Sequence, residues 1–243
     1  MNLKKLIYTF LPAFVKSAIR ARYYLKKFNG VSINSEKDLL LLPEVVKSGN
    51  VVLDIGANFG LYTKILAELV GANGRVYSFE PVPDTFDVLA NNVRRSGLHQ
   101  VTAMPLAISN TSGVATISIP KYEDGSENYY EASLVTSKNS VGIAIQTLRL
   151  DDRIDLFQRL DFVKMDVEGH EPPALEGMRA IVEQFYPIFL IEINDGFAPG
   201  STGNLVRNMM AEWGYSMHYY DGSALRLSAG KEDGVNYVFK KGN

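Results

Sequence analysis

Carboxylate side chains and one imidazole are concentrated in a short segment in the second half of the chain. Asp166, Glu168 and Glu171 flank His170 at the end of the apolar run 162–167. Carboxylates and a neutral imidazole can take a proton from a hydroxyl or stabilise charge that develops in a transition state. The sequence contains no Cys, which excludes thiolate nucleophiles, disulfides and Cys-based zinc sites. These residue types therefore point to acid–base or electrostatic chemistry.

A second chemically informative segment is the turn 54–60, which follows the apolar run 51–55. Gly56 and Gly60 permit backbone angles and a close ligand approach that a Cβ would block. A dinucleotide turn requires Gly-x-Gly-x-x-Gly, and Asn58 stands where its second glycine would be. This spacing disfavours a nicotinamide-dependent reductase. Asp54, the first residue of this segment, suits an ammonium group better than a pyrophosphate.

Glu80 follows the next apolar run, 75–79, where a carboxylate can accept hydrogen bonds from both hydroxyls of a ribose. These features together match S-adenosylmethionine. Asp54 suits its amino group, the glycines allow its close approach, and Glu80 suits its ribose. We therefore expect this cofactor. The alternative is a tight turn followed by a solvated acid.

The elements that must position these residues alternate between strands and helices. This alternation predicts an α/β fold with a doubly wound, seven-stranded, mostly parallel sheet of the Rossmann-like type. The last strand follows a turn at 221–222 without a crossover helix, which makes it antiparallel. The expected strands are 51–55, 75–79, 101–108, 162–167, 188–193, 215–219 and 235–240, and the expected helices 36–47, 61–70, 84–96, 173–184 and 204–213.

Residues 109–160 form an insertion longer than a strand-to-helix connection needs. Residues 113–119 and 141–148 predict an added hairpin or small sheet. The polar stretch between them contains Tyr122, Tyr129 and Tyr130, which either stack on a sugar or belong to an ordinary polar loop. We assign the insertion to a catalytic domain spanning 36–243, as a substrate cap.

Residues 1–35 form a separate, basic arm. Residues 1–30 carry seven Lys and Arg and no acid, whereas the remainder carries 18 Lys and Arg against 27 Asp and Glu, a net charge of −9. An acidic body excludes nucleic acid as the main ligand. The apolar run 6–15 is too short to cross a bilayer, and Lys16 follows where a cleavage site would need small residues. We expect a cytoplasmic protein whose arm is an amphipathic helix packed on the body or in a homodimer; peripheral contact with an anionic membrane is the alternative.

Several segments carry a resemblance to a known family. VLDIGANFG at 52–60, FEP at 79–81, LAIS at 106–109, FVKMDVEGHE at 162–171 and LIEI at 190–193 resemble the FkbM-type methyltransferases of the class I S-adenosylmethionine-dependent fold. The resemblance implies methyl transfer to a hydroxyl of a saccharide or a polyketide. It implies cofactor contacts from Asp54, Gly56, Ala57, Asn58, Phe59, Gly60, Glu80, Pro81, Ala107 and Asp166.

Methyl transfer is an in-line displacement, so the acceptor must lie over the carboxyl ends of strands 51–55 and 162–167. Asp166 is expected to face the methionine end of the cofactor. Glu168 is our choice for the base that assists the acceptor hydroxyl, with His170 as the close competitor. Glu171 is interpreted as an acid in the first turn of the following helix.

The remaining charged groups have simpler roles. Lys164, inside a buried strand, is expected to pair with a neighbouring carboxylate. His99 and His218 are interpreted as structural or surface residues. We expect no metal; the alternative is Mg²⁺ held by Asp166 and Glu192. The function that follows is an O-methyltransferase of a saccharide or glycoconjugate, with another small-molecule acceptor or a non-catalytic nucleotide-binding module as alternatives.

Overall fold

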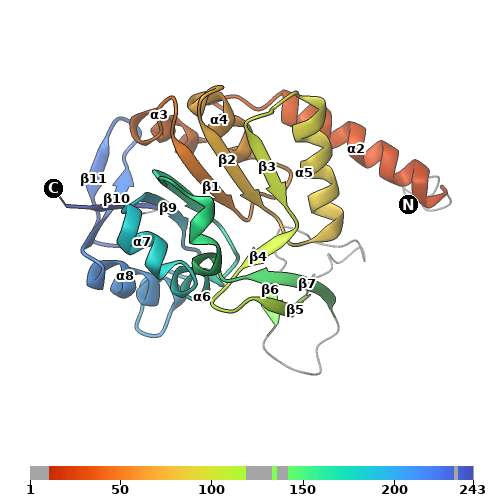
Figure 1. Cartoon of the computed structure of the whole chain (residues 1–243). Coiled ribbons are helices and arrows are strands. Elements are labelled where there is room, and N and C mark those ends of the chain that lie inside the picture. The colour runs from red at the N-terminus through yellow and green to blue at the C-terminus, as the bar shows by residue number, and fades with distance from the viewer. Residues whose placement is uncertain (1–10, 119–132, 136–141, 233–234, 243) are drawn as a thin grey trace.

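The computed structural model describes residues 11–118, 133–135, 142–232 and 235–242. Within these residues the main sheet has eight strands in the order β11-β10-β12-β9-β8-β1-β2-β3 (Figure 1). The strands β3, β2, β1, β8 and β9 run parallel, whereas β12 runs antiparallel to both β9 and β10. Their bounds are β1 (Val51–Ile55), β2 (Arg75–Phe79), β3 (Val101–Met104), β8 (Phe162–Met165), β9 (Ile188–Glu192), β10 (Tyr215–Tyr220), β11 (Leu225–Leu227) and β12 (Asn236–Lys241).

Helices cover both faces of this sheet, as the alternating pattern predicts. Val52 of β1 belongs to the buried cluster that contains Ile65 of α4 on one face. Its neighbour Leu53 belongs to the cluster that contains Leu175 and Met210 on the other. Successive side chains of a strand point to opposite faces, so an apolar strand buries both. The helices are α2 (Ala13–Asn29), α3 (Leu42–Val45), α4 (Leu61–Val70), α5 (Pro83–Arg95), α6 (Glu171–Glu176), α7 (Arg179–Phe185) and α8 (Thr202–Glu212), with 3₁₀ turns η1 (Lys37–Leu41) and η3 (Leu150–Leu156). The predicted doubly wound fold is confirmed, with β11 as an eighth strand.

Three predicted elements are interrupted in the structure. The expected strand 101–108 divides at Pro105 into β3 and β4 (Leu106–Ile108), because proline has no N–H for the ladder. The expected helix 36–47 is a 3₁₀ turn followed by α3. The expected helix 173–184 divides into α6 and α7 at Gly177, where a Cβ would lie 1.9 Å from the carbonyl oxygen of Ser109. The backbone immediately after β4 therefore runs directly against the end of α6.

The insertion builds a second sheet below β3 (Figure 1). Its order is β4-β7-β5-β6, with β5 (Gly113–Ser118), β6 (Ser133–Val135) and β7 (Ile143–Leu148). Of the predicted alternatives, hairpin or small sheet, the small sheet is confirmed, with β5 and β7 paired antiparallel within it. β4 pairs with β7 and thereby joins the insertion to the end of β3. The three tyrosines at 122, 129 and 130 lie outside the described residues.

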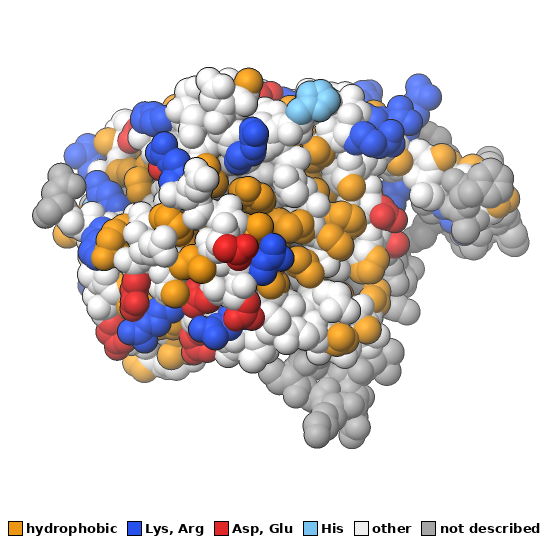
Figure 2. All heavy atoms as spheres, in the orientation of Figure 1, with side chains coloured by type: hydrophobic (Ala, Val, Ile, Leu, Met, Phe, Trp, Pro, Cys, Tyr) orange, Lys and Arg blue, Asp and Glu red, His pale blue; other side chains and the backbone are white. Residues whose placement is uncertain are grey.

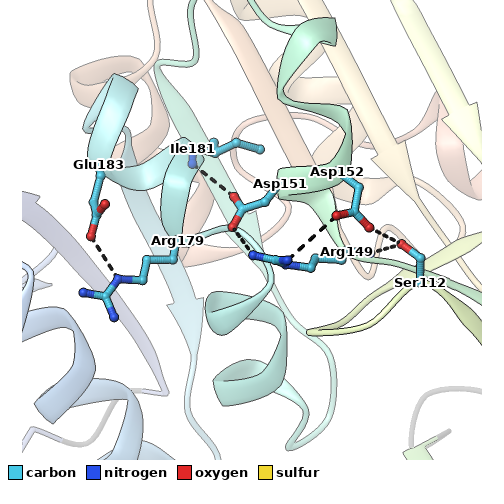
Figure 3. Close-up of polar contacts among 7 residues, drawn as sticks. All are labelled: Ser112, Arg149, Asp151, Asp152, Arg179, Ile181 and Glu183. Carbon is cyan, nitrogen blue, oxygen red and sulfur yellow. Dashed lines mark hydrogen bonds and ion pairs between the residues drawn. The ribbon is translucent and has the colours of Figure 1, made fainter.

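Polar contacts fasten the second sheet to the body (Figure 3). Arg149, at the end of β7, forms ion pairs with Asp151 at 3.3 Å and with Asp152 at 3.9 Å. Ser112 donates to Asp152 at 2.8 Å and accepts from the amide of Arg149 at 3.0 Å. The other oxygen of Asp151 accepts from the amide of Ile181 in the first turn of α7 at 3.1 Å. Because Asp151 links both sides, the small sheet is held against α7.

The second half of α2 packs on the body, as the favoured interpretation of the arm predicts. Arg20 forms an ion pair with Asp84 at the start of α5 at 3.0 Å. The ring of Tyr24 contacts that of Phe59 with centroids 5.7 Å apart, and Phe28 is completely buried. Figure 1 shows the first half of α2 projecting beyond α5. Over the described residues, the structure contains no helix with the length and apolar character of a membrane span.

Candidate active site

A cleft of about 710 Å³, open solvent at its mouth included, lies over the carboxyl ends of β1, β2 and β8. The strand ends and the second sheet together form its wall. Its lining residues are Ile55, Gly56, Asn58, Glu80, Pro81, Val82, Leu106, Ala107, Ile108, Ile117, Asp166, Val167, Glu168 and His170. Ligands of doubly wound sheets bind at this edge. Of the predicted site residues, the structure therefore brings eight together here: Gly56, Asn58, Glu80, Pro81, Ala107, Asp166, Glu168 and His170.

The glycine turn is packed tightly against the end of β8. Gly56 has a φ of +81°, and a Cβ there would lie 1.7 Å from the carbonyl oxygen of Asp166. The amides of Gly56 and Ala57 both donate to the carbonyl of Phe79, at 3.0 and 2.9 Å. Both amides are therefore already hydrogen-bonded within the protein. What the turn can offer a ligand is a stretch of backbone without a side chain, which the ligand can approach closely. This is the role expected of a glycine at such a turn.

Glu80 is the acid of the cleft with the best-defined partners. Its two carboxylate oxygens accept from the amides of Asn58 at 3.0 Å and Val82 at 2.9 Å, and its side chain is buried. Burial raises the pKa of Glu80 to about 7, although the two amides oppose this shift. Each oxygen keeps a further lone pair for a donor such as a ribose hydroxyl.

Four residues predicted to contact the cofactor do not reach the wall of the cleft: Asp54, Ala57, Phe59 and Gly60. All four are buried. Asp54 points to the α4 side of the sheet, where Thr63 donates to it at 2.5 Å and in turn contacts the hydroxyl of Ser78 at 2.9 Å. Burial raises the pKa of Asp54 to about 6. Phe59 turns toward the ring of Tyr24 in the arm, and a Cβ at Gly60 would lie 2.9 Å from Phe28.

The cleft also contains side chains that sequence reasoning did not select. Val82 and Ile117 form an apolar wall with Ala107, and these three belong to one buried cluster. A flat apolar group such as a purine suits this wall. Ile117 comes from β5 of the insertion. The signal in the sequence that could have indicated its role was its position in a strand of alternating apolar and polar residues. The glycine turn, Glu80 and this wall together fit a nucleoside-containing cofactor.

His170 stands at the start of α6 and faces the cleft. Its Nε2 atom lies 3.0 Å from the hydroxyl of Ser109, which follows β4. Burial lowers the pKa of His170, which favours the neutral imidazole. Ser109 ends the motif LAIS at 106–109, but the sequence does not predict its contact with the imidazole.

Glu168 lies between the cleft and a second cavity. Its φ is +50°, which is unusual for a residue other than glycine and turns the chain sharply after β8. The second cavity encloses about 490 Å³, open solvent included, and is lined by Glu168, Gly169, Glu171, Glu192, Ile193, Asn194, Asp195 and Thr202. Glu168 is the residue that lines both spaces.

A buried cation connects the two carboxylates at the ends of β8 and β9. The ammonium of Lys164 lies 3.7 Å from carboxylate oxygens of both Asp166 and Glu192, and the side chain is 1% exposed. The predicted pairing of Lys164 is thus confirmed. Burial and then the charge of Asp166 raise the pKa of Glu192 to about 7. Asp166 lines the cleft, and Glu192 lines the second cavity. Lys164 therefore forms an ion pair with one acid from each of the two spaces.

Glu171 and His218 have structural partners, whereas His99 lies exposed on the surface. Glu171 is buried in the first turn of α6 and accepts from the amides of Val167 at 3.2 Å and Gly169 at 3.3 Å, which closes the turn around Glu168. His218 contacts the carbonyl of Ser216 within β10, away from the cleft. In the part of the chain that is described, no group of three or more His, Asp or Glu is arranged to hold a metal.

Solved structures share this fold. The FkbM methyltransferase from Methylobacillus flagellatus KT superposes with a TM-score of 0.52 at 16% identity, covering 97% of this chain. This chain spans 57% of that protein's chain. An O-methyltransferase from Bacillus cereus in complex with SAH superposes with a TM-score of 0.50 at 14% identity, covering 92% of this chain and 89% of the other. The fold is therefore that of the Rossmann-like, S-adenosylmethionine-dependent methyltransferases.

The family is shown by the sequence model of the FkbM methyltransferase domain, which matches residues 54–217. The chain belongs to this family and is an S-adenosylmethionine-dependent methyltransferase. A hexuronic acid methyltransferase from Haloferax volcanii is 29% identical over 177 residues, covering 72% of this chain and 69% of the relative. A protein-L-isoaspartate O-methyltransferase from Methanococcoides burtonii is 39% identical over 67 residues, 28% of this chain and 31% of the relative. The resemblance seen in the motifs and the expected cofactor are both confirmed.

Proposed function

We propose that this enzyme transfers the methyl group of S-adenosylmethionine to a hydroxyl of a saccharide or glycoconjugate. The observation that carries the proposal is the position of Glu168 between two adjoining spaces. One space has the apolar wall and the buried acid that suit a nucleoside. The other is lined by side chains that form hydrogen bonds. A base between them can meet both the acceptor and the methyl donor.

The cofactor side is assigned to the cleft. Glu80 would accept the ribose hydroxyls, Gly56 would lie against the cofactor, and Asp166 would favour its positively charged methionine end. Asp54 would act from beneath the turn through its charge, because Thr63 occupies its carboxylate. The cofactor supplies a methyl group that is already activated as a sulfonium. The protein must therefore position the acceptor and manage its proton.

The acceptor side is assigned to the second cavity. Glu192, Asn194 and Thr202 present a carboxyl, an amide and a hydroxyl, a set that can bind the many hydroxyls of a sugar. The acids of this cavity oppose a carboxylate at the same position, so a hydroxyl is favoured as the attacking group. A hexuronic acid, after which the Haloferax relative is named, carries both hydroxyls and a carboxylate. The similarity to that relative supports a saccharide as the acceptor.

Glu168 is proposed as the base, with Asp166 as an electrostatic partner. His170 lines the cleft but not the second cavity, and its Nε2 atom contacts Ser109. This places His170 second as the base. Transfer breaks the sulfonium-to-methyl bond and forms the oxygen-to-methyl bond, while the hydroxyl proton passes to the carboxylate of Glu168.

The experiment is transfer of labelled methyl from S-adenosylmethionine to a panel of neutral sugars, uronic acids, glycolipids and polyketide alcohols. The product is then treated with mild alkali, which hydrolyses a methyl ester but leaves a methyl ether intact. Alkali-stable label on a sugar is the expected result. Label released by alkali would move the reaction to a carboxylate, label only on polyketides would replace the acceptor class, and cofactor binding without transfer to any acceptor would favour a non-catalytic module.

A further inference from the structure

The arm helix α2 has two different sides, and only one of them is used by the fold. One side of the helix points to the body. On this side, Arg20 forms an ion pair with Asp84 and Tyr24 contacts Phe59. Phe28, one turn further on, is buried in the core. These three residues are four apart, so they share one side of the helix. The other side of α2 needs a separate explanation.

The opposite side of α2 carries a continuous exposed stripe, Ile19, Arg22, Tyr23 and Lys26, called here the outer stripe. The spacing of three, four and seven residues from Ile19 places all four side chains in one row. Ile19 is 46% exposed and Tyr23 is 62% exposed, and Arg22 and Lys26 are exposed as well. Figure 2 shows Lys and Arg side chains gathered over this part of the molecule. The row therefore alternates apolar or aromatic side chains with cations.

The charge around the outer stripe has one sign. Residues 1–30 carry seven Lys and Arg and no acid, while the rest of the chain has a net charge of −9. A body of this charge would be repelled by an anionic surface, and an arm of this charge would be attracted to it. The outer stripe lies on the side of α2 that faces away from the contacts of Arg20, Tyr24 and Phe28 with the body. The stripe can therefore approach such a surface with the helix between it and the acidic body, and the first half of α2, which projects beyond α5, does not obstruct it (Figure 1).

We propose that the outer stripe of α2 docks the enzyme on an anionic membrane surface. Ile19 and Tyr23 would enter the headgroup region, where a tyrosine can keep its hydroxyl in water, and Arg22 and Lys26 would meet lipid phosphates. A second copy of this chain is a poorer occupant, because a two-fold contact between outer stripes would oppose like charges. Membrane docking uses the helix as a surface anchor and requires no spanning segment.

The test is flotation of the full chain with vesicles of mixed phosphatidylcholine and phosphatidylglycerol, compared with pure phosphatidylcholine. We expect binding only to the anionic vesicles and its loss at high salt. Arg22→Glu together with Lys26→Glu should weaken binding at least about tenfold, and Tyr23→Ser should weaken it at unchanged charge. The matched control reverses two exposed cations elsewhere, Arg75→Glu with Lys231→Glu.

Circular dichroism and calorimetry with S-adenosylhomocysteine verify that each variant is folded. Equal binding to both vesicles, or equal weakening by the control pair, would overturn the proposal. So would anionic binding that survives the outer-stripe variants, because the attachment would then lie elsewhere in the arm. Analytical ultracentrifugation provides the last outcome: a dimer that the outer-stripe variants dissociate would assign the stripe to a second copy instead.

Discussion

Gly56 and Asp166 meet at the centre of the candidate site: a Cβ on Gly56 would lie 1.7 Å from the carbonyl oxygen of Asp166. The contact joins the turn after β1 to the end of β8, two segments far apart in the sequence. It places the surface of the glycine turn beside the acid proposed to face the cofactor. The absence of a side chain at position 56 is therefore required by the fold itself.

Gly56→Ala is predicted to destabilise the protein by at least about 2 kcal/mol and to abolish cofactor binding. The new methyl group would clash with backbone, and the φ of +81° is itself unfavourable for alanine. Urea unfolding and calorimetry with S-adenosylhomocysteine measure the two effects. Gly49→Ala is the control, because Gly49 has a φ of +82° but open space around it; a loss of only about 1 kcal/mol is expected there. Equal losses in both variants would contradict the steric argument.

The stability of the cofactor-free enzyme is predicted to fall as pH rises from about 5 to 8. Burial raises the pKa of Asp54 to about 6 and those of Glu80 and Glu192 to about 7. These carboxyls hold protons in the folded state at pH values where the unfolded chain has released them. Unfolding then becomes easier as pH rises through this window and levels off above it. A melting temperature lower by a few degrees at pH 8 is expected, and Glu80→Gln should reduce the slope.

Cofactor affinity should change with pH in the opposite direction. Ionised Glu80 is the better acceptor for ribose hydroxyls, and ionised acids attract the cationic cofactor. Calorimetry with S-adenosylmethionine should therefore show tighter binding at pH 8 than at pH 6. Glu80→Ala should weaken binding at least about tenfold at pH 8, with a smaller effect at pH 6. Affinity that is independent of pH and of Glu80 would remove the ribose assignment.

Glu168→Gln is predicted to lower kcat at least about 100-fold while changing the affinity for S-adenosylhomocysteine by less than about threefold. The substitution removes the proton acceptor but keeps the shape of the side chain. His170→Gln should have a smaller effect on kcat. Glu212→Gln, at the exposed end of α8 and outside both cavities, is the control. A larger loss in the His170 variant would transfer the role of base to the imidazole.

Lys164→Met is predicted to destabilise the enzyme by roughly 3 kcal/mol, because Asp166 and Glu192 would lose their buried cation. Adding Glu192→Gln should recover at least about 1 kcal/mol, which a double-mutant cycle in urea would detect. The exposed pair Arg179–Glu183 is the control (Figure 3); although its atoms lie only 2.9 Å apart, its removal should not measurably change stability. Purely additive effects of the Lys164 and Glu192 substitutions would contradict the coupling.

Turnover is predicted to be insensitive to EDTA. Asp166 and Glu192, the residues that could have held Mg²⁺, are both engaged by the ammonium of Lys164. A divalent cation would have to approach within a few ångströms of that charge. Turnover measured before and after chelation, with and without added Mg²⁺, tests this. Loss of activity that Mg²⁺ restores would assign a metal to the two carboxylates.

Sequence reasoning was most accurate where local chemistry decides the structure. The strands 51–55 and 75–79 and the helix 61–70 have the predicted bounds, because β-branched apolar runs and glycines mark their limits. It was less accurate where long-range packing decides. The strand 101–108 divides at Pro105, and its second part pairs with a strand some forty residues later, since β4 is held by β7 of the insertion.

The sequence by itself determined the class of enzyme. The class follows from local patterns that occur in a fixed order along the chain. These patterns are a strand, a glycine turn, an acid after the second strand and an acid-rich turn after β8. Only the tertiary structure decided which of those side chains line the cleft. Asp54 and Phe59 turn into the core, Ile117 reaches the cleft from the insertion, and Ser109 contacts the imidazole of His170. The physical reason is that the face to which a side chain points depends on strand pairing and on the packing of neighbouring layers, which no single segment encodes.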